Sequence, residues 1–250
     1  MSTWVGIGRS EIGLVRTMNQ DAFATLDPLG LWAVADGMGG HVGGEIAAQT
    51  AIASITAQAQ LSADTLRQGQ TAPPAFLTDV ITQAHHAILG RVKLEPTLRG
   101  MGTTIVLLYI EETTESLMAH LAHLGDSRAY RFRSGTLTPL TRDHTLIEKY
   151  LARGILTPKT ARTHPERHVL TRALGISTPV KPSISSCPLE PQDLLLLCSD
   201  GLTKMMEDDD IQDIFTAGKG DPIRTCDRLI NESLDRGGID NVTVVVIAHT

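Results

Sequence analysis

An apolar run passes directly into a glycine-rich segment at Leu31-Trp32-Ala33-Val34-Ala35-Asp36-Gly37-Met38-Gly39-Gly40-His41-Val42-Gly43-Gly44-Glu45. Five glycines within eight residues give the backbone a freedom that packing does not require and that costs entropy on folding. At the end of the predicted strand 31–35, the Asp36 carboxylate and the Gly37 carbonyl can offer oxygen ligands to a hard cation. A glycine-rich turn that caps a helix at Glu45 is the alternative interpretation. The segment matches neither the P-loop nor the dinucleotide-binding glycine pattern.

The same design, an apolar strand followed by an aspartate, recurs along the chain. Leu194–Cys198 leads into Ser199-Asp200-Gly201, and Leu121–Leu124 leads into Gly125-Asp126. Asp240 stands just before the final apolar run, 242–248. Each aspartate alone is most simply a turn residue. Four of them at strand ends predict a cluster, and clustered carboxylates repel one another unless a cation neutralises them.

Secondary-structure patterns predict an α+β fold with largely antiparallel sheets. Strands 103–110 and 117–124 flank an acidic turn, and strands 129–133 and 137–139 surround Ser134-Gly135, as in hairpins. Segments 194–198 and 242–248 are apolar at every position, which is typical of buried central strands. Helical spacing covers 45–59, 75–93, 143–153, 208–217 and 222–236. The proline-containing stretch 179–191 is interpreted as an extended connection.

Composition narrows the class of protein. The chain has 250 residues, of which 42% are hydrophobic and 20% charged, and this suits a single globular domain over 1–250. A net charge of −6 argues against nucleic acid or an anionic membrane as the main partner. No apolar run reaches membrane-spanning length, and three scattered cysteines predict no disulfide framework. We therefore expect a cytoplasmic monomer.

Five motifs in a fixed order resemble the protein phosphatase 2C family, the metal-dependent serine/threonine phosphatases, in their compact bacterial form. The resemblance spans nearly the whole chain. The motifs are Arg16 with Asn19-Gln20-Asp21, the Ala35–His41 run, Gly125-Asp126-Ser127-Arg128, Ser199-Asp200-Gly201-Leu202 and Asp240-Asn241-Val242-Thr243.

The resemblance implies a four-layer α-β-β-α sandwich of two antiparallel sheets flanked by helices, with Mg²⁺ or Mn²⁺ ions at one edge. It implies that Asp36 bridges two core ions, with Gly37 contributing its carbonyl, and that Asp200 and Asp240 complete the pair. Asp126 would hold a third, weaker ion, and Asp21 would act through a water molecule. Gln20 stands where many eukaryotic relatives carry a glutamate.

The chemistry follows from these roles. Two ions can lower the pKa of a shared water and place the resulting nucleophile in line with the scissile P–O bond. Arg16 would hold the phosphoryl oxygens, and His41 would protonate the departing seryl or threonyl oxygen. The substrates would be proteins phosphorylated on serine or threonine by an opposing kinase. The segment 142–175 corresponds to a mobile flap over the site, with solvated helices as the alternative. Its three histidines lack the spacing of a zinc site.

Rival phosphatase chemistries lack their signatures. No cysteine is followed by an arginine at the spacing of a cysteine-nucleophile enzyme, and Asp208-Asp209-Asp210-Ile211-Gln212 lacks the final residue of the aspartyl-phosphate motif. That acidic run is instead predicted to open a helix. The alternative from another class is a catalytically weak relative that acts as a binding or regulatory module. Loss of a metal aspartate or of the arginine would indicate it, and every such position is filled.

Overall fold

Two strands that are apolar on both faces form the centre of the first sheet. The computed structural model describes residues 4–39, 43–162, 164–176 and 179–250. In it the two predicted central strands, β10 (Leu194–Cys198) and β11 (Val242–His249), are buried and pair antiparallel with each other. The sheet order is β1-β11-β10-β7-β8. The remaining strands are β1 (Trp4–Glu11), β7 (Arg128–Arg133) and β8 (Thr136–Pro139).

The second sheet has the order β2-β3-β5-β6-β9, with a short β4 paired to the end of β3. Its strands are β2 (Asp21–Leu26), β3 (Leu31–Met38), β4 (Gly102–Thr103), β5 (Ile105–Glu112), β6 (Leu117–Leu124) and β9 (Ser183–Pro188). The β5–β6 and β7–β8 hairpins confirm the predicted pairs. The stretch 179–191 is more than a connection, because β9 lies within it and pairs with β6 at the sheet edge, where prolines are tolerated.

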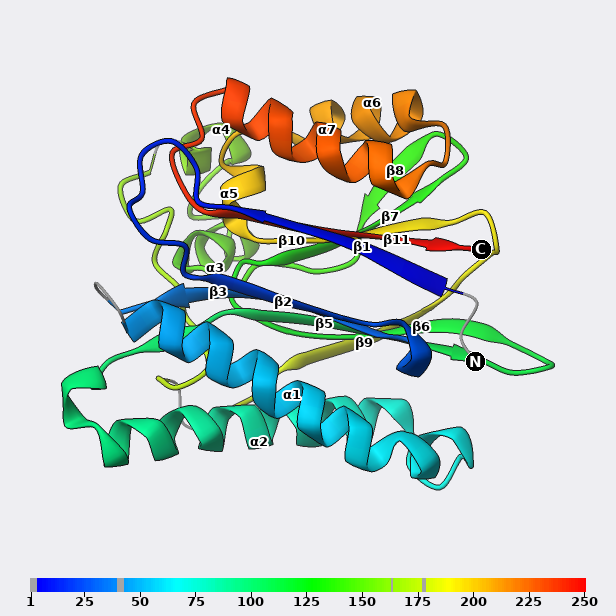
Figure 1. The fold of residues 1–250 in the computed structure, drawn as a ribbon. Helices are drawn as coiled ribbons and strands as arrows, with labels where there is room; N and C mark the ends of the chain where they lie inside the picture. Colours follow the sequence, from blue (N-terminus) through cyan, green and yellow to red (C-terminus); the bar gives the residue numbers. More distant parts are fainter. Residues whose placement is uncertain (1–3, 40–42, 163, 177–178) are drawn as a thin grey trace.

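Helices cover the outer face of each sheet (Figure 1). The second sheet carries α1 (Gly43–Arg67) and α2 (Pro73–Leu94), and the first carries α5 (Asp200–Thr203), α6 (Asp208–Gly218) and α7 (Pro222–Asp235). Two single turns, η1 (Asp27–Leu29) and η2 (Pro96–Leu98), lie in connections. The predicted helix 45–59 was too short, since α1 continues to Arg67. The acidic run at Asp208 does open a helix, α6, as predicted.

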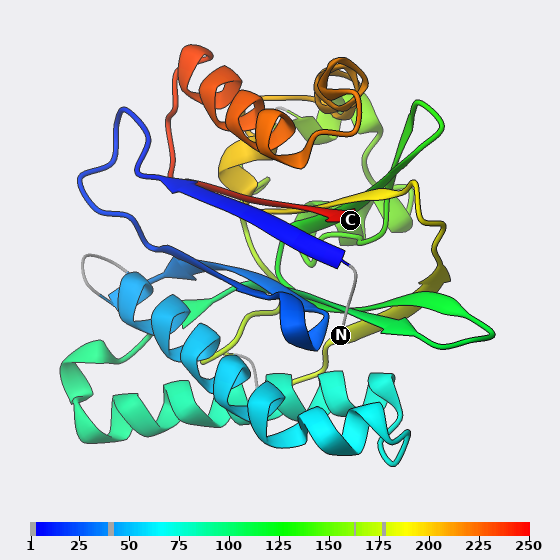
Figure 2. The same ribbon diagram turned by 45° about the vertical axis from the view of Figure 1, so that its right-hand side comes forward.

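Three hydrophobic clusters correspond to the three interfaces of this four-layer sandwich (Figure 2). One lies between α1–α2 and the second sheet, one between α5–α7 and the first sheet, and one between the sheets. Alternation along each strand decides which cluster a residue joins: in β3, Ala33 and Ala35 face the helices, whereas Trp32 and Val34 face the other sheet. The predicted α-β-β-α architecture is confirmed.

The segment 142–175 contains α3 (Leu146–Ala152) and α4 (Pro158–Arg162). The helix predicted at 143–153 begins later, because Thr145 caps it by accepting a hydrogen bond from the Glu148 amide at 3.2 Å. Both helices lie at the end of the sandwich where the chain passes from β1 to β2 (Figure 1). Among the described residues, no helix combines the length and apolarity needed to cross a membrane.

Candidate metal centre

Asp36 lies on the inner face of the second sheet, in the space between the two sheets. The strand continues beyond the predicted end at Ala35, so Asp36 sits within β3 and shares the orientation of Val34. Its backbone amide donates to Thr104 Oγ1 at 3.0 Å, and its carbonyl accepts from the Thr104 amide at 2.9 Å. The register of β2 and β3 sets Asp21 directly opposite Asp36. Two carboxylates are therefore fixed side by side by strand pairing alone.

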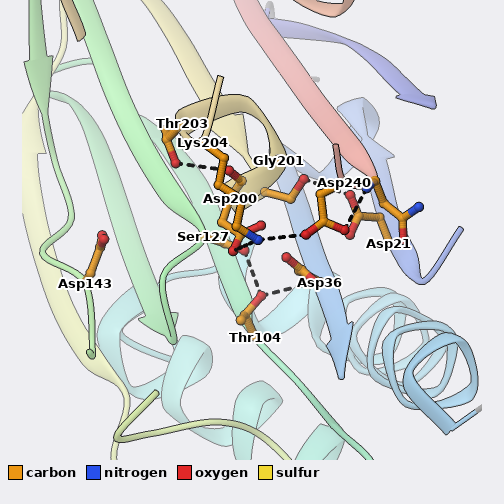
Figure 3. Close-up of polar contacts among 12 residues, drawn as sticks. Asp21, Asp36, Thr104, Ser127, Asp143, Asp200, Gly201, Thr203, Lys204 and Asp240 are labelled. Carbon is orange, nitrogen blue, oxygen red and sulfur yellow. Dashed lines mark hydrogen bonds and ion pairs between the residues drawn. The ribbon is translucent and has the colours of Figure 1, made fainter. Parts of the chain in front are cut away.

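The other sheet contributes Asp200 and Asp240 to the same end of the sandwich. Asp200 is the first residue of α5, directly after β10, and Asp240 precedes β11. Ser199 joins the sheets: its Oγ donates to Asp21 Oδ2 at 2.7 Å and accepts from the Thr243 amide at 2.9 Å. Figure 3 shows Asp21, Asp36, Asp200 and Asp240 gathered around one space, as the sequence predicted.

The glycines that follow Asp36 and Asp200 are needed for close packing of the backbone. A Cβ on Gly37 would lie 2.0 Å from the Gly44 carbonyl oxygen, and one on Gly201 would lie 1.9 Å from that of Asn241. No side chain fits these positions. The recurring Asp-Gly pair thus reflects a carboxylate placed where two backbone segments touch.

Asp126 joins the cluster from the loop after β6. It is nearly buried, and its neighbour Ser127 shares a 2.7 Å hydrogen bond with Thr104, the residue that holds Asp36. Burial, followed by repulsion from Asp200 and Asp143, raises the pKa of Asp126 to about 7. All four strand-end aspartates singled out in the sequence are therefore brought together.

Burial is also the main cause of the raised pKa values of Asp21 and Asp36. It raises the pKa of Asp21 to about 7, and the charges of Asp200 and Asp240 add to the shift. Burial and repulsion from Asp21 and Asp200 raise the pKa of Asp36 well above its usual value. In the absence of a cation, this pocket therefore disfavours the ionised carboxylates.

The donor set suits a hard divalent cation. Buried oxygens Oδ1 of Asp21 and Oδ1 of Asp200 have no hydrogen-bond partner in the described part of the chain, and carboxylate oxygens are the ligands that Mg²⁺ and Mn²⁺ prefer. Within those same residues, no three His, Cys, Asp or Glu side chains converge as a ready-made site. The carboxylates of the described residues therefore face a common space, but no three of them converge on a single point.

Arg16 reaches the cluster, as predicted, and its fork is held by Asp240. Arg16 Nε lies 2.8 Å from Asp240 Oδ1, and Nη2 donates to Oδ2 at 2.9 Å. The Arg16 side chain is 51% exposed, so its guanidinium stays open to the cleft. Burial would raise the pKa of Asp240, but Lys204 and Arg16 hold it below its usual range.

Two residues at the site were missed by sequence reasoning. Lys204 lies 2.5 Å from Asp200 Oδ2 and 2.7 Å from Asp240 Oδ2. Asn241 accepts from the Gln20 amide and donates to the carbonyls of Ile12 and Met18, which fixes the loop that carries Arg16. The signal for Lys204 was its spacing of four from Asp200, which places both on one helical face.

The predicted proton donor, His41, lies outside the described residues. Of the flap histidines, His144 is buried among polar partners: Nδ1 accepts from the Gly125 amide at 3.2 Å, and Nε2 lies 2.9 Å from Ser183 Oγ. It stacks on His123 at 4.4 Å between ring centroids. Burial, with help from His123, lowers the pKa of His144 to about 3. This histidine therefore stays neutral and braces the loop that carries Asp126.

A continuous cleft gives access to the carboxylates. One part, of about 810 Å³, runs between α3–α4 and α5–α6, and a second, of about 650 Å³, extends over Asp36 and Gly37. The two parts share the residues Arg16, Asp126, His168, Asp200, Lys204 and Asp240. The cleft is large enough for a peptide segment rather than for a phosphate alone.

Comparison with known proteins shows which family this chain resembles. The sequence model described as Protein phosphatase 2C matches residues 8–228. The chain is 37% identical over 238 residues to the serine/threonine protein phosphatase PstP of Mycobacterium tuberculosis, covering 95% of this chain but only 43% of the relative. It is 32% identical over 247 residues to the serine/threonine phosphatase stp of Listeria welshimeri, covering 96% and 93%.

A solved structure extends the likeness to the fold. The catalytic domain of a serine/threonine protein phosphatase named PstP, in complex with two manganese ions, superposes with a TM-score of 0.81 at 33% identity. The superposition covers 98% of each chain. With the matched family model and these identities over most of its length, the chain belongs to the protein phosphatase 2C family.

Proposed function

We propose that this chain hydrolyses phosphoserine and phosphothreonine in proteins in a Mg²⁺- or Mn²⁺-dependent reaction. The observation that carries the proposal is the cluster of buried and partly buried aspartates from both sheets, two of them with unpartnered oxygens among the described residues, beside an open cleft that Asp36, Asp126, Asp200 and Asp240 line. The two manganese ions of the solved relative support the choice of cation.

Each residue has a distinct proposed role. Asp36 and the Gly37 carbonyl would hold the two core ions together with Asp200 and Asp240, while Asp21 would act through a water molecule. When bound, the ions would supply the Lewis acidity that activates a water for attack on phosphorus. The Arg16 guanidinium, oriented by Asp240, would bind the phosphoryl oxygens through the N–H groups that Asp240 leaves free. His41 would donate a proton to the departing seryl or threonyl oxygen.

The flap, 142–175, would select among phosphoproteins. Ile147 and Leu151 of α3 line the cleft opposite α5–α6, and Arg167 and His168 line it nearer the carboxylates. Side chains at these positions would contact residues that flank the phosphorylated one. We propose a cytoplasmic monomer with one catalytic domain, acting on proteins phosphorylated by a serine/threonine kinase.

Hydrolysis of phosphothreonine and phosphoserine peptides tests the proposal directly. With Mn²⁺ we expect phosphate release that a chelator abolishes, and little release from the matched phosphotyrosine peptide. Folded protein that releases no phosphate above the chelator control would instead indicate the catalytically weak binding module. A small aryl phosphate, assayed in parallel, separates loss of chemistry from loss of peptide recognition.

Asp126→Asn tests the third ion. We expect this variant to keep two Mn²⁺ per chain and to lose a weaker third one, because Asp126 comes from the loop after β6 and is not one of the four residues proposed to hold the two core ions. Electron paramagnetic resonance of free Mn²⁺ during titration measures the number of bound ions. An unchanged number of ions in Asp126→Asn would contradict the proposed role.

A further inference from the structure

Lys204 puts a positive charge inside the proposed metal centre. It directly follows the single turn α5 as its C-cap, and the spacing of four residues brings its ammonium back over Asp200. The Nζ atom lies 2.5 Å from Asp200 Oδ2 and 2.7 Å from Asp240 Oδ2, between the two carboxylates (Figure 3). Its side chain is only 20% exposed. The ammonium thus occupies a position where two carboxylates from the first sheet could share a metal ion.

The cationic groups are confined to one half of the cluster. Asp240 is paired with Arg16 as well as with Lys204. Within the described ranges no ion pair involves Asp21 or Asp36, and Asp21 Oδ1 has no partner. An ion that arrives at the Asp36 half therefore meets carboxylates that are not ion-paired with a described lysine or arginine. One that arrives at the Asp200–Asp240 half has to displace an ammonium.

Lys204 also explains why the carboxylates of the first sheet stay close together without a metal. Asp200 and Asp240 carry like charges, and their repulsion would separate them without a cation between them. A lysine is suited to temporary occupancy because its four-carbon stem can swing while the backbone stays in place.

We propose that Lys204 is an internal competitor for one of the two core ions: it holds the Asp200–Asp240 half of the centre in the metal-free protein and is displaced when an ion binds there. The two core ions consequently bind with unequal affinity. This inference rests on the proposed two-ion site and adds to it a built-in control of metal occupancy. Binding of the weaker ion completes the two-ion centre. The concentration of metal ions therefore sets the fraction of protein molecules that carry both ions.

Mn²⁺ titration of charge variants tests the competition. Lys204→Gln keeps a hydrogen-bond donor without the charge, Lys204→Ala removes the contact, and Lys204→Arg keeps the charge. We expect both neutral variants to bind the weaker core ion at least about tenfold more tightly, and Lys204→Arg to stay close to wild type. Lys93→Gln, an exposed lysine on α2, is the matched control for net charge and should change nothing.

The affected ion is assigned with Asp240→Asn. The class of ion that is weakened in Asp240→Asn should be the class that is tightened in Lys204→Gln, as measured by electron paramagnetic resonance and calorimetry without any turnover assay. Equal affinities in wild type and both neutral variants would overturn the competitor role, even if the wild type is an active phosphatase. A wild type that binds no Mn²⁺ would overturn the proposed function as well.

Discussion

Asp36→Asn is expected to lower Mn²⁺-dependent kcat/KM by at least about a thousandfold while the protein stays folded. The amide has nearly the shape of the carboxylate but lacks the charge that would bridge two ions. Stability should be retained because burial and neighbouring carboxylates already disfavour the ionised form of Asp36, as its raised pKa indicates. Phosphopeptide kinetics and the midpoint of chemical unfolding, both with and without Mn²⁺, measure the two effects.

Asp193→Asn is the control, because Asp193 is a buried aspartate whose carboxylate is paired with an arginine. Its carboxylate receives Nε and Nη2 of Arg133 at 2.6 and 2.5 Å, at the opposite end of β10 from Asp200. Removing that charge should cost several kcal/mol of unfolding free energy and leave the activity of the folded fraction intact. Near-normal turnover in Asp36→Asn would contradict its bridging role.

Removing metal ions is expected to destabilise the fold more at about pH 8.5 than at about pH 6.5. In the metal-free fold Asp21 and Asp126 have pKa values of about 7, whereas an unfolded aspartate titrates near 3.8. The folded state thus holds protons that the unfolded state has released. This contribution to stability is complete below about pH 4 and is lost as pH rises through about 7, by on the order of 1 kcal/mol across the measured window.

Two comparisons isolate this effect. Buried histidines such as His144, whose lowered pKa acts in the opposite sense, still contribute near pH 6.5, where an unfolded histidine is about half protonated. The metal-free wild type is therefore compared with metal-free Asp21→Asn, which keeps these histidines and should lose less unfolding free energy than the wild type as the pH rises from about 6.5 to about 8.5. Saturating Mn²⁺ binds the ionised carboxylates and should raise the unfolding free energy by roughly 3 kcal/mol at a hundredfold excess over Kd. An identical change in unfolding free energy between about pH 6.5 and about pH 8.5 in the metal-free wild type and in metal-free Asp21→Asn would contradict the assignment.

Sequence patterns located the aspartates because each follows or precedes a strand that is apolar on both faces. Asp36, Asp200 and Asp240 stand out for this reason, and strand pairing then brings Asp21 opposite Asp36. Lys204 could not be located in the same way. A lysine after a turn is ordinarily solvated, and only the meeting of α5 with the residue before β11 gives it two carboxylate partners.

The sequence patterns did not predict β1, and the reason is physical. β1 contains Gly6 and Gly8, which contribute no side chain to the alternation pattern. The space they leave is filled from the other sheet, since a Cβ there would lie 2.3 Å from the Trp32 ring or 2.2 Å from the Phe23 ring. Such complementarity between sheets depends on residues distant in the sequence, and it is absent from any local window.

The position of β11 has a consequence for how the molecule folds. This strand lies between β1 and β10, so the first sheet cannot close until segments more than two hundred residues apart have met. Contacts of such long range slow folding because loop-closure entropy is lost before pairing compensates for it. Asp240 lies just before that strand, so the metal centre is complete only once this long-range pairing has formed. We therefore expect metal ions to stabilise the completed fold rather than to direct its early stages.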